Sequence, residues 1–379
     1  MLATMRKVIV QLGDRSYPIL IGPNLLPLLG AECARRKFVK QCAIISDHRV
    51  AKLYADTAMR SLRSAGFSPV LIVVKAGETA KSLKTVQACY DQLAQHRMER
   101  KSFIVALGGG VVGDLAGFVA ATYLRGIEFV QVPTTLLAQV DSSVGGKVGV
   151  NLKAGKNLVG AFYQPQFVLC DLNVLSTLPE REFRAGLAEV IKYGIIQDAQ
   201  LFRRIERERE KILRRDIDVM APIIARCCEI KARIVAEDEI ESGLRAILNF
   251  GHTIGHAVEA ISGYGKYLHG EAISIGQVAA AKLSSEAIGL SPLDTSRITS
   301  LFSALGLPIM IKLTPPARRK LLQAMQLDKK VSGGEIKFVL AKKIGHVVFG
   351  QKVPAELLNR ILHEISTDKA LTLGANSLV

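Results

Sequence analysis

The stretch Phe103-Ile-Val-Ala-Leu107-Gly108-Gly109-Gly110-Val111-Val112-Gly113-Asp114 carries the pattern that decides the fold. Its five apolar residues predict a strand, and its glycines predict a tight turn. The mostly apolar residues after the glycines predict a helix. Glycines at such a turn let the backbone approach a pyrophosphate, and the helix N-terminus offers N–H groups and a positive dipole end. Because the spacing differs from G-x-G-x-x-G, an ordinary strand–helix turn stays open as an alternative.

The wider segment Phe103–Leu124 contains a single charge, Asp114, and is long enough to suggest a membrane span. Its glycines favour a packed strand, turn and buried helix instead. The apolar run at the N-terminus is too short for the core of a signal peptide. The six cysteines form no C-x-x-C pair. We therefore expect reduced thiols in a cytoplasmic protein.

Strand-like runs alternate with helical segments on both sides of this stretch, which predicts a parallel sheet with helices on its faces. The expected strands are Lys7–Leu12, Tyr17–Ile21, Cys42–Ser46, Val70–Val74, Phe103–Leu107 and Phe129–Val132. The expected helices among them lie near Leu25–Arg36, Val50–Ala65, Lys84–Gln95 and Val111–Leu124.

After Leu178 the pattern changes to long helical segments, and Pro179 suits the first turn of a helix. We expect helices near Glu182–Ile195, Gln200–Leu213, Met220–Asp238, Arg245–Ser262, Glu271–Ile288 and Ala355–Ile365, with short strands at Ile336–Leu340 and Val347–Phe349. The predicted architecture is an α/β, Rossmann-like N-terminal domain with a parallel sheet at residues 1–178. A mainly α-helical domain that binds metal and substrate follows at 179–379.

The charge balance is strongly basic, with 50 Lys and Arg against 34 Asp and Glu and a formal net charge of +16. This invites the alternative of a nucleic-acid-binding protein. The basic residues are interleaved with acids, as in Arg203–Lys211, and no aromatic residues accompany them as stacking platforms. An anionic small substrate is therefore the favoured partner, with neither nucleic acid nor membrane expected.

Three charged residues follow early strands and are candidates for a dinucleotide site. Asp47 follows the strand Cys42–Ser46, where a carboxylate can hold a ribose diol. Glu78 and Lys81 follow Val70–Val74, where strand ends open onto a ligand crevice in parallel sheets. Each residue standing alone would be read as an ordinary charged loop residue.

A group of histidines suggests a metal site. His252 and His256 share a helix face, and His269 follows a glycine-containing loop. Glu189 lies on an otherwise apolar helix, where an unpaired carboxylate is costly. Two imidazoles and a carboxylate suit a catalytic Zn²⁺. The alternative is a buried Glu189–Lys192 pair with ordinary core histidines.

Thr253 stands where H-E-x-x-H requires Glu, which excludes that metalloprotease motif. Basic residues flank the histidine and glycine motifs at Lys147, Lys156, Lys192, Lys231 and Arg245. Surface lysines are usually solvated. Glycines beside Lys147 and Lys156 favour close approach to a ligand instead.

Taken together, these motifs resemble the 3-dehydroquinate synthase family of sugar phosphate cyclases. The matching segments are Gly77–Ser82, Gly108–Asp114, Ala121–Gly126, Pro133–Lys147, Ala188–Gly194, Asp238–Arg245, Asn249–His256 and His269–Glu271. Their order and number make the resemblance specific. It implies an enzyme that uses NAD and Zn²⁺, or Co²⁺, to convert 3-deoxy-D-arabino-heptulosonate 7-phosphate to 3-dehydroquinate and phosphate.

The resemblance also implies roles for individual residues. Zinc would be held by Glu189, His252 and His269. NAD would be contacted by Asp47, Glu78, Lys81, Gly109, Gly110, Val111, Gly113, Asp114, Thr134, Thr135, Lys147, Lys156 and Thr177. The substrate, expected between the domains, would be surrounded by Asp141, Lys147, Asn157, Lys192, Lys231, Arg245, Asn249 and His256, with Lys330 or its neighbour Lys329 as a further contact. Arg125 would reach the phosphate bound by a neighbouring subunit, which implies a homodimer.

In that reaction C5 is oxidised transiently, phosphate leaves by β-elimination, C5 is reduced again, and ring opening and an aldol step follow. His256 and Glu241 are the candidates for proton transfer. Three residues depart from the family pattern: Val148, Tyr267 and His48, of which only His48 bears on a cofactor contact. Relatives that cyclise other sugar phosphates, or oxidise glycerol, are the nearest alternatives. Arg245, Asn249 and His256 together favour the dehydroquinate reaction because they suit a carboxylated, phosphorylated substrate.

Overall fold

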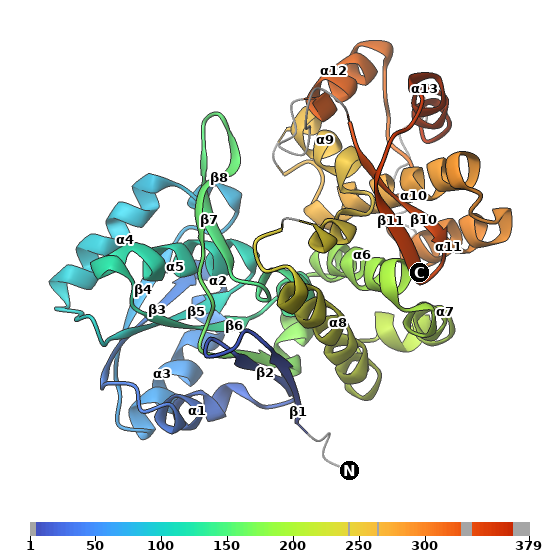
Figure 1. Cartoon of the computed structure of the whole chain (residues 1–379). Coiled ribbons are helices and arrows are strands. Elements are labelled where there is room, and N and C mark those ends of the chain that lie inside the picture. The colour runs from blue at the N-terminus through green and yellow to red at the C-terminus, as the bar shows by residue number, and fades with distance from the viewer. Residues whose placement is uncertain (1–4, 242, 264, 327–335, 367–379) are drawn as a thin grey trace, which may run out of the picture. The chain divides into compact units, whose positions relative to one another are not determined.

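The computed structural model describes residues 5–241, 243–263, 265–326 and 336–366. The chain forms two compact units, and each is built from two separate segments (Figure 1). Unit 1 comprises the residues up to Val190 together with Glu210–Arg245, and unit 2 comprises Ile191–Arg209 and the residues from Ala246 onward. The expected boundary at residue 178 stays a prediction. Lys329 and Lys330 lie outside the described residues.

Unit 1 contains a seven-stranded sheet with the strand order β1-β2-β9-β6-β5-β3-β4. Its strands are β1 (Arg6–Val10), β2 (Tyr17–Gly22), β3 (Gln41–Asp47), β4 (Ser68–Val74), β5 (Phe103–Gly108), β6 (Glu128–Pro133) and β9 (Val168–Asp171). Only the β1–β2 pair is antiparallel, and the other neighbouring strands run parallel. The predicted Rossmann-like sheet is confirmed, and β9 is a strand that the sequence pattern did not reveal.

Both faces of the sheet are buried, which explains why its central strands read as continuous apolar runs. Along β3, Ala43 and Ile45 join one core cluster while Cys42 and Ile44 join the other. Helices α1 (Leu29–Arg35) and α3 (Asp56–Ser64) cover one face. The other face is covered by α4 (Leu83–Gln95) and α5 (Gly110–Thr122), as Figure 1 shows.

Four further elements complete the part of unit 1 that concerns the site. The strands β7 (Lys147–Leu152) and β8 (Gly155–Phe162) form an antiparallel hairpin whose base packs on α5. The π-helical turn η5 (Ala138–Ser142) follows β6, and α8 (Ile217–Glu237) packs against both η5 and β1. The hairpin was missed in the sequence because its lysines and glycines were interpreted as a ligand loop.

Unit 2 is mainly helical, as predicted. It contains α9 (His252–Ser262), α10 (His269–Ile288), α11 (Pro292–Ala304), α12 (Pro315–Gln326), α13 (Ala355–Glu364) and the hairpin of β10 (Phe338–Lys343) and β11 (His346–Gln351). Helices α6 (Glu180–Gln197) and α7 (Ala199–Leu213) contribute residues to both units. In the described part of the chain, no helix combines the length and hydropathy needed to cross a membrane.

The prediction of one continuous helix over Arg245–Ser262 is wrong. A 3-10 helix, η7 (Leu244–Asn249), ends before Gly251, and α9 begins at His252. Gly251 has φ 77°, and a Cβ atom there would lie 2.5 Å from the backbone nitrogen of Gln277 on α10. The break therefore follows from the close approach of α10, which the helical periodicity does not report.

The seam between α9 and α10 provides a test of this packing. A Cβ atom on Gly276 would lie 2.1 Å from Gly251 O and 2.7 Å from Gly255 N. Because backbone atoms cannot move aside cheaply, we expect Gly276→Ala to lower the free energy of unfolding by about 2 kcal/mol. Urea denaturation would measure it. Gly243→Ala is the control, since its nearest heavy atom would be 4.0 Å away. Equal stability of the two variants would contradict this account of the seam.

Candidate functional site

The glycine-rich turn between β5 and α5 lies close to the side chains of neighbouring elements. Cβ atoms on Gly109, Gly110 and Gly113 would lie 2.9 Å from Thr135 Cγ2, 2.9 Å from Ser142 Oγ and 2.8 Å from Gln131 Oε1, respectively. Gly109 is the N-cap of α5, so the first N–H groups of that helix lie at the turn. The same turn holds the half-buried Val111. A side chain at any of these three positions would therefore force a neighbouring side chain to shift.

Two threonines line the segment that follows β6 beside this turn. Thr134 N donates to Gly108 O at 2.9 Å, and Thr135 Oγ1 accepts from Ala138 N at 3.1 Å. Thr134 Oγ1 is buried and has no hydrogen-bond partner among the described residues. A buried hydroxyl of this kind needs an explanation. Together with the helix N-terminus, it makes the turn fit the phosphates of a dinucleotide.

Lys81 brings a predicted cofactor residue and a predicted substrate residue together. Its ammonium group donates to Asp114 Oδ2 and to Asn157 Oδ1, both at 2.6 Å. Lys81 is only 4% exposed, whereas Asn157 is exposed, so the cluster reaches from the interior to the surface. Burial raises the pKa of the Asp114 carboxyl, and the neighbouring Lys81 offsets part of this rise. The cluster joins β5–α5, the turn after β4 and the β7–β8 hairpin.

The remaining cofactor candidates of unit 1 lie at separate places. Asp47 ends β3, and its Oδ1 caps the short helix α2 (His48–Val50) by accepting from Arg49 N at 2.8 Å. Thr177 ends the 3-10 helix η6 (Leu172–Thr177), and its hydroxyl contacts the hydroxyl of Tyr54. Lys156 lies half-buried on β8. Tyr54, the partner of Thr177, was not among the residues predicted from the sequence.

Three charged contacts in unit 1 involve predicted substrate residues. Lys231 Nζ donates to both Asp141 O and Asp141 Oδ1 at 2.6 Å. Lys147 Nζ pairs with the carboxylate of Glu241. Partial burial and the neighbouring Arg245 lower the pKa of Lys147, whereas Glu241 raises it. The structure therefore brings the predicted residues together in acid–base pairs.

Arg245 is almost fully buried, at 2% exposed. Its guanidinium group donates to Glu239 O and, at 3.1 Å, to Gly145 O, and its backbone N–H donates to Asp238 Oδ2 at 2.9 Å. Its Nε atom is buried without a hydrogen-bond partner among the described residues. Burial lowers the pKa of this group. A buried cation whose Nε–H lacks an acceptor among the described residues suits an anionic ligand.

The turn η5, which carries Asp141, is held by buried polar contacts that the sequence did not reveal. The thiol of Cys228 donates to Gln139 O at 3.3 Å, one turn before Lys231 on α8. The Gln139 amide donates to Asp171 O at 3.0 Å and to Pro133 O at 3.3 Å. Cys228 is fully buried, and burial raises its pKa to about 12. The thiol therefore acts here as a neutral donor.

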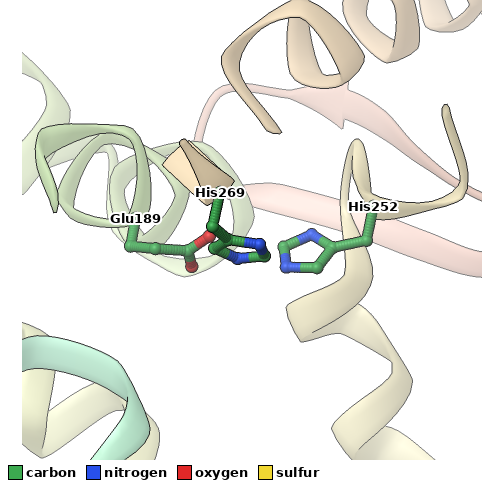
Figure 2. A group of neighbouring side chains, drawn as sticks. All are labelled: Glu189, His252 and His269. Carbon is green, nitrogen blue, oxygen red and sulfur yellow. The ribbon is translucent and has the colours of Figure 1, made fainter. Parts of the chain in front are cut away.

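The candidate metal centre consists of Glu189, His252 and His269, whose ligand atoms lie within 4.8 Å of one another. Figure 2 shows the three side chains pointing toward one another. Glu189 lies on α6, one residue from the end of the first segment of unit 1, and the histidines begin α9 and α10. Glu189 is fully buried and His252 is 7% exposed. The donor set of two imidazoles and one carboxylate fits Zn²⁺ with an open position.

His256 and Glu259 adjoin this group on α9. The three imidazole ring centroids lie 5.2 Å (His252–His256), 5.7 Å (His252–His269) and 6.1 Å (His256–His269) apart. Glu259 Oε2 lies 3.0 Å from His269 Nδ1, so Nε2 would be the ring nitrogen of His269 that binds a metal. Glu259 was missed in the sequence, although its spacing of three from His256 and seven from His252 places it on the same helix face.

The other predicted residues lie on or near these elements. Lys192 is buried on α6 with its ammonium group 5.3 Å from the centroid of the Tyr193 ring. Asn249 is half-buried at the end of η7, before the break at Gly251. Arg125 is exposed at the end of the 3-10 helix η4 (Tyr123–Arg125), with φ 71°.

Solved structures first identify the class of protein. The chain is similar to 2-epi-5-epi-valiolone synthase from Streptomyces hygroscopicus with NAD⁺ and Zn²⁺ bound, with 27% identity, a TM-score of 0.83, and coverage of 94% of this chain and 98% of the other. It is also similar to 2-deoxy-scyllo-inosose synthase complexed with carbaglucose-6-phosphate, NAD⁺ and Co²⁺, with 28% identity, a TM-score of 0.83, and coverage of 95% and 100%. The fold is that of the sugar phosphate cyclases.

The particular family follows from the sequence. A family model of the 3-dehydroquinate synthase N-terminal region matches residues 71–185, and one of the C-terminal region matches residues 186–331. The 3-dehydroquinate synthase of Pelobacter propionicus is 51% identical over 93% of this chain and 98% of its own. The chain belongs to the 3-dehydroquinate synthase family, which confirms the resemblance inferred from the motifs.

The metal centre predicts a graded loss of metal binding. We expect His252→Ala to lose bound Zn²⁺ and activity together, because a ligand is removed. Glu259→Gln should weaken Zn²⁺ binding about tenfold, because it removes the carboxylate that orients His269. Competition with a chromophoric chelator measures Zn²⁺ binding in both variants, and a phosphate-release assay measures activity. Glu206→Gln, which breaks an ion pair with Arg297 on unit 2, is the control. Full zinc content in His252→Ala would remove this residue from the site.

Proposed function

We propose that this chain is a 3-dehydroquinate synthase, a carbon–oxygen lyase that acts in the shikimate pathway toward chorismate and the aromatic amino acids. It converts 3-deoxy-D-arabino-heptulosonate 7-phosphate to 3-dehydroquinate and phosphate. The observation that carries the proposal is family membership at about half identity over nearly the whole chain. Identity to the cyclases that make other products is much lower, which favours the dehydroquinate reaction over theirs.

The proposed cofactors are NAD and a divalent metal, Zn²⁺ or Co²⁺. Support for NAD comes from the helix N-terminus at the glycine turn and the buried hydroxyl of Thr134. Support for the metal comes from the donor set of the buried Glu189 and His252 and the half-buried His269. When bound, the dinucleotide supplies a reversible hydride acceptor and the metal supplies a Lewis acid for vicinal oxygens of the substrate.

The chemistry explains why the chain needs acid–base groups around these cofactors. Transient oxidation at C5 makes the proton at C6 acidic, so phosphate can leave by β-elimination. Return of the hydride, ring opening and an aldol step then close the carbocycle. We assign proton transfer at the C5 hydroxyl and phosphate to His256, and a second proton transfer to Glu241. Glu241 forms an ion pair with Lys147, which holds the carboxylate beside this proposed phosphate contact.

Anion recognition is assigned to the basic residues. Arg245 and Lys231 are proposed to bind the substrate carboxylate, and Lys147, Asn157 and Asn249 the phosphate. The buried Nε donor of Arg245 supports its part, since a planar guanidinium is suited to a carboxylate. Asp141 and Lys192 complete the proposed substrate set. Asp141 would act while bonded to Lys231, which fixes its position.

We further propose a cytoplasmic homodimer. The six cysteines are buried and form no disulfide, as expected in a reducing compartment. Arg125 is exposed, which is compatible with a contact to a neighbouring copy and not with a role in the core of its own subunit.

The proposed reaction predicts an unusual stoichiometry. Incubation of the protein with the heptulosonate phosphate, NAD⁺ and Zn²⁺ should release one phosphate per turnover with no net NADH, because the hydride is returned. A phosphate assay and absorbance at the NADH wavelength, read together, measure this. A chelator should stop phosphate release, and added Zn²⁺ should restore it. Continuous accumulation of NADH would instead indicate a dehydrogenase.

The proposed role of Arg125 predicts a kinetic defect in an intact dimer. Arg125→Ala should raise the KM for the heptulosonate phosphate about tenfold, because a charged contact to a phosphate is lost. Steady-state kinetics measure the KM, and sedimentation of the same sample shows whether the dimer is intact. Arg207→Ala, an exposed arginine on α7, is the control. Wild-type kinetics in the Arg125 variant would contradict the cross-subunit role.

A further inference from the structure

Asn151 occupies an irregular position in the β7–β8 hairpin. The antiparallel pairing of the hairpin shifts register between Val150 and Leu152, so Asn151 falls at a bulge. Instead of pairing within the hairpin, it forms an isolated parallel bridge with Ser82, in the turn after β4. Bulges turn the polar groups of a strand away from its partner, and they are common beside active sites.

Asn151 makes three hydrogen bonds, and each involves a different residue of the proposed site. Its backbone N–H donates to Lys81 O at 2.9 Å. Its side-chain amide donates to Glu78 Oε1 at 2.7 Å, and its side-chain carbonyl accepts from Asn157 N at 2.9 Å. Glu78 opens the 3-10 helix η3 (Glu78–Ala80), while Asn157 lies on β8. Asn151 therefore connects the turn after β4 to the tip of the hairpin.

Lys81 closes these contacts into a ring. Its ammonium group donates to Asn157 Oδ1 at 2.6 Å and lies 4.0 Å from Glu78 Oε1, the oxygen that accepts from Asn151. Asn157 has φ 52°, a left-handed conformation that few side chains adopt readily. The ring holds Asn157 in this conformation through both its backbone N–H and its side chain.

Apolar packing alone gives the hairpin tip little support. Val148 and Val150, near the base, are buried, whereas Leu152 and Leu158, near the tip, are 38% and 41% exposed. The orientation of the tip therefore depends on polar contacts, and Asn151 supplies two of them through one side chain.

We propose that Asn151 is a positioning residue that couples the cofactor side of the site to the substrate side. By bonding Glu78 and Asn157 at once, it presents the proposed NAD contacts Glu78 and Lys81 together with the proposed phosphate contact Asn157. Binding at one set then stabilises the geometry of the other. This inference rests on the proposed function, since that function assigns the two ligands.

Two variants separate the two side-chain bonds. Asn151→Ala removes both. Asn151→Asp keeps an oxygen that can accept from Asn157 N but places a second oxygen against Glu78 in place of the amide donor. Gln87→Ala on α4 is the matched control, because it also removes an amide-to-carboxylate hydrogen bond, 2.9 Å long and on the surface of the same unit. Circular dichroism would establish that each variant is folded.

The measurements are the Kd for NAD⁺ by titration calorimetry, which needs no turnover, and the KM and kcat for the heptulosonate phosphate. Asn151→Ala should raise both the Kd and the KM about tenfold and change kcat less, since no group that touches the substrate is removed. Asn151→Asp should raise the Kd for NAD⁺ at least as much but the KM less. The control should match the wild-type protein in all three.

Specific outcomes would overturn the inference. An unchanged Kd for NAD⁺ in folded Asn151→Ala and Asn151→Asp would remove the link to Glu78. A raised Kd with an unchanged KM in Asn151→Ala would remove the link to Asn157. If the wild-type protein binds NAD⁺ but releases no phosphate from the heptulosonate phosphate, the proposed function fails, and the NAD⁺ titrations alone then support or overturn the link to Glu78. Absence of NAD⁺ binding by the wild-type protein would overturn both.

Discussion

Unit 1 depends on the close packing of the glycine-rich turn between β5 and α5, where three glycines lie against neighbouring side chains. Gly109, Gly110 and Gly113 each lie where a Cβ atom would collide with β6 or the segment after it. The turn leads into the start of α5, which carries Asp114. Through Ser142 it lies beside the turn η5, whose Asp141 is held by Lys231 from α8. One tight turn thus adjoins the elements that carry several of the candidate site residues.

A similar constraint operates in unit 2. The break at Gly251 and the contact of Gly276 with it let α10 pass close to the start of α9. This brings His252 and His269, which begin the two helices, to a ring-centroid separation of 5.7 Å. The proximity of His252 and His269 therefore depends on the absence of side chains where α9 and α10 pack together. In an uninterrupted helix, the imidazole of His252 would point in another direction.

The sequence was sufficient for the strands whose two faces are buried, since Cys42–Ser46 and Phe103–Leu107 read as unbroken apolar runs. It was insufficient for the hairpin Lys147–Phe162, where glycines and lysines conceal the alternation of buried Val148 and Val150. It was misleading at Gly251, because an apolar period of 3.6 cannot register a neighbouring helix. Helices α11 and α12 and strand β9 were missed as well. For the candidate site, the motifs predicted Lys81 and Asp114, which the structure brings into contact. The motifs did not point to their neighbours Tyr54, Asn151, Cys228 and Glu259, because only spatial partners distinguish these residues.

The buried thiols described above have a practical consequence for work in solution. All six cysteines are buried, and burial raises the pKa of Cys42 and Cys89 to about 12. Since thiolates are the reactive species, maleimide and iodoacetamide reagents should leave the folded protein largely unmodified. A single cysteine introduced at the exposed position Leu158 would then be an almost background-free attachment point for a spin label or fluorophore at the hairpin tip. The native cysteines would not have to be replaced first.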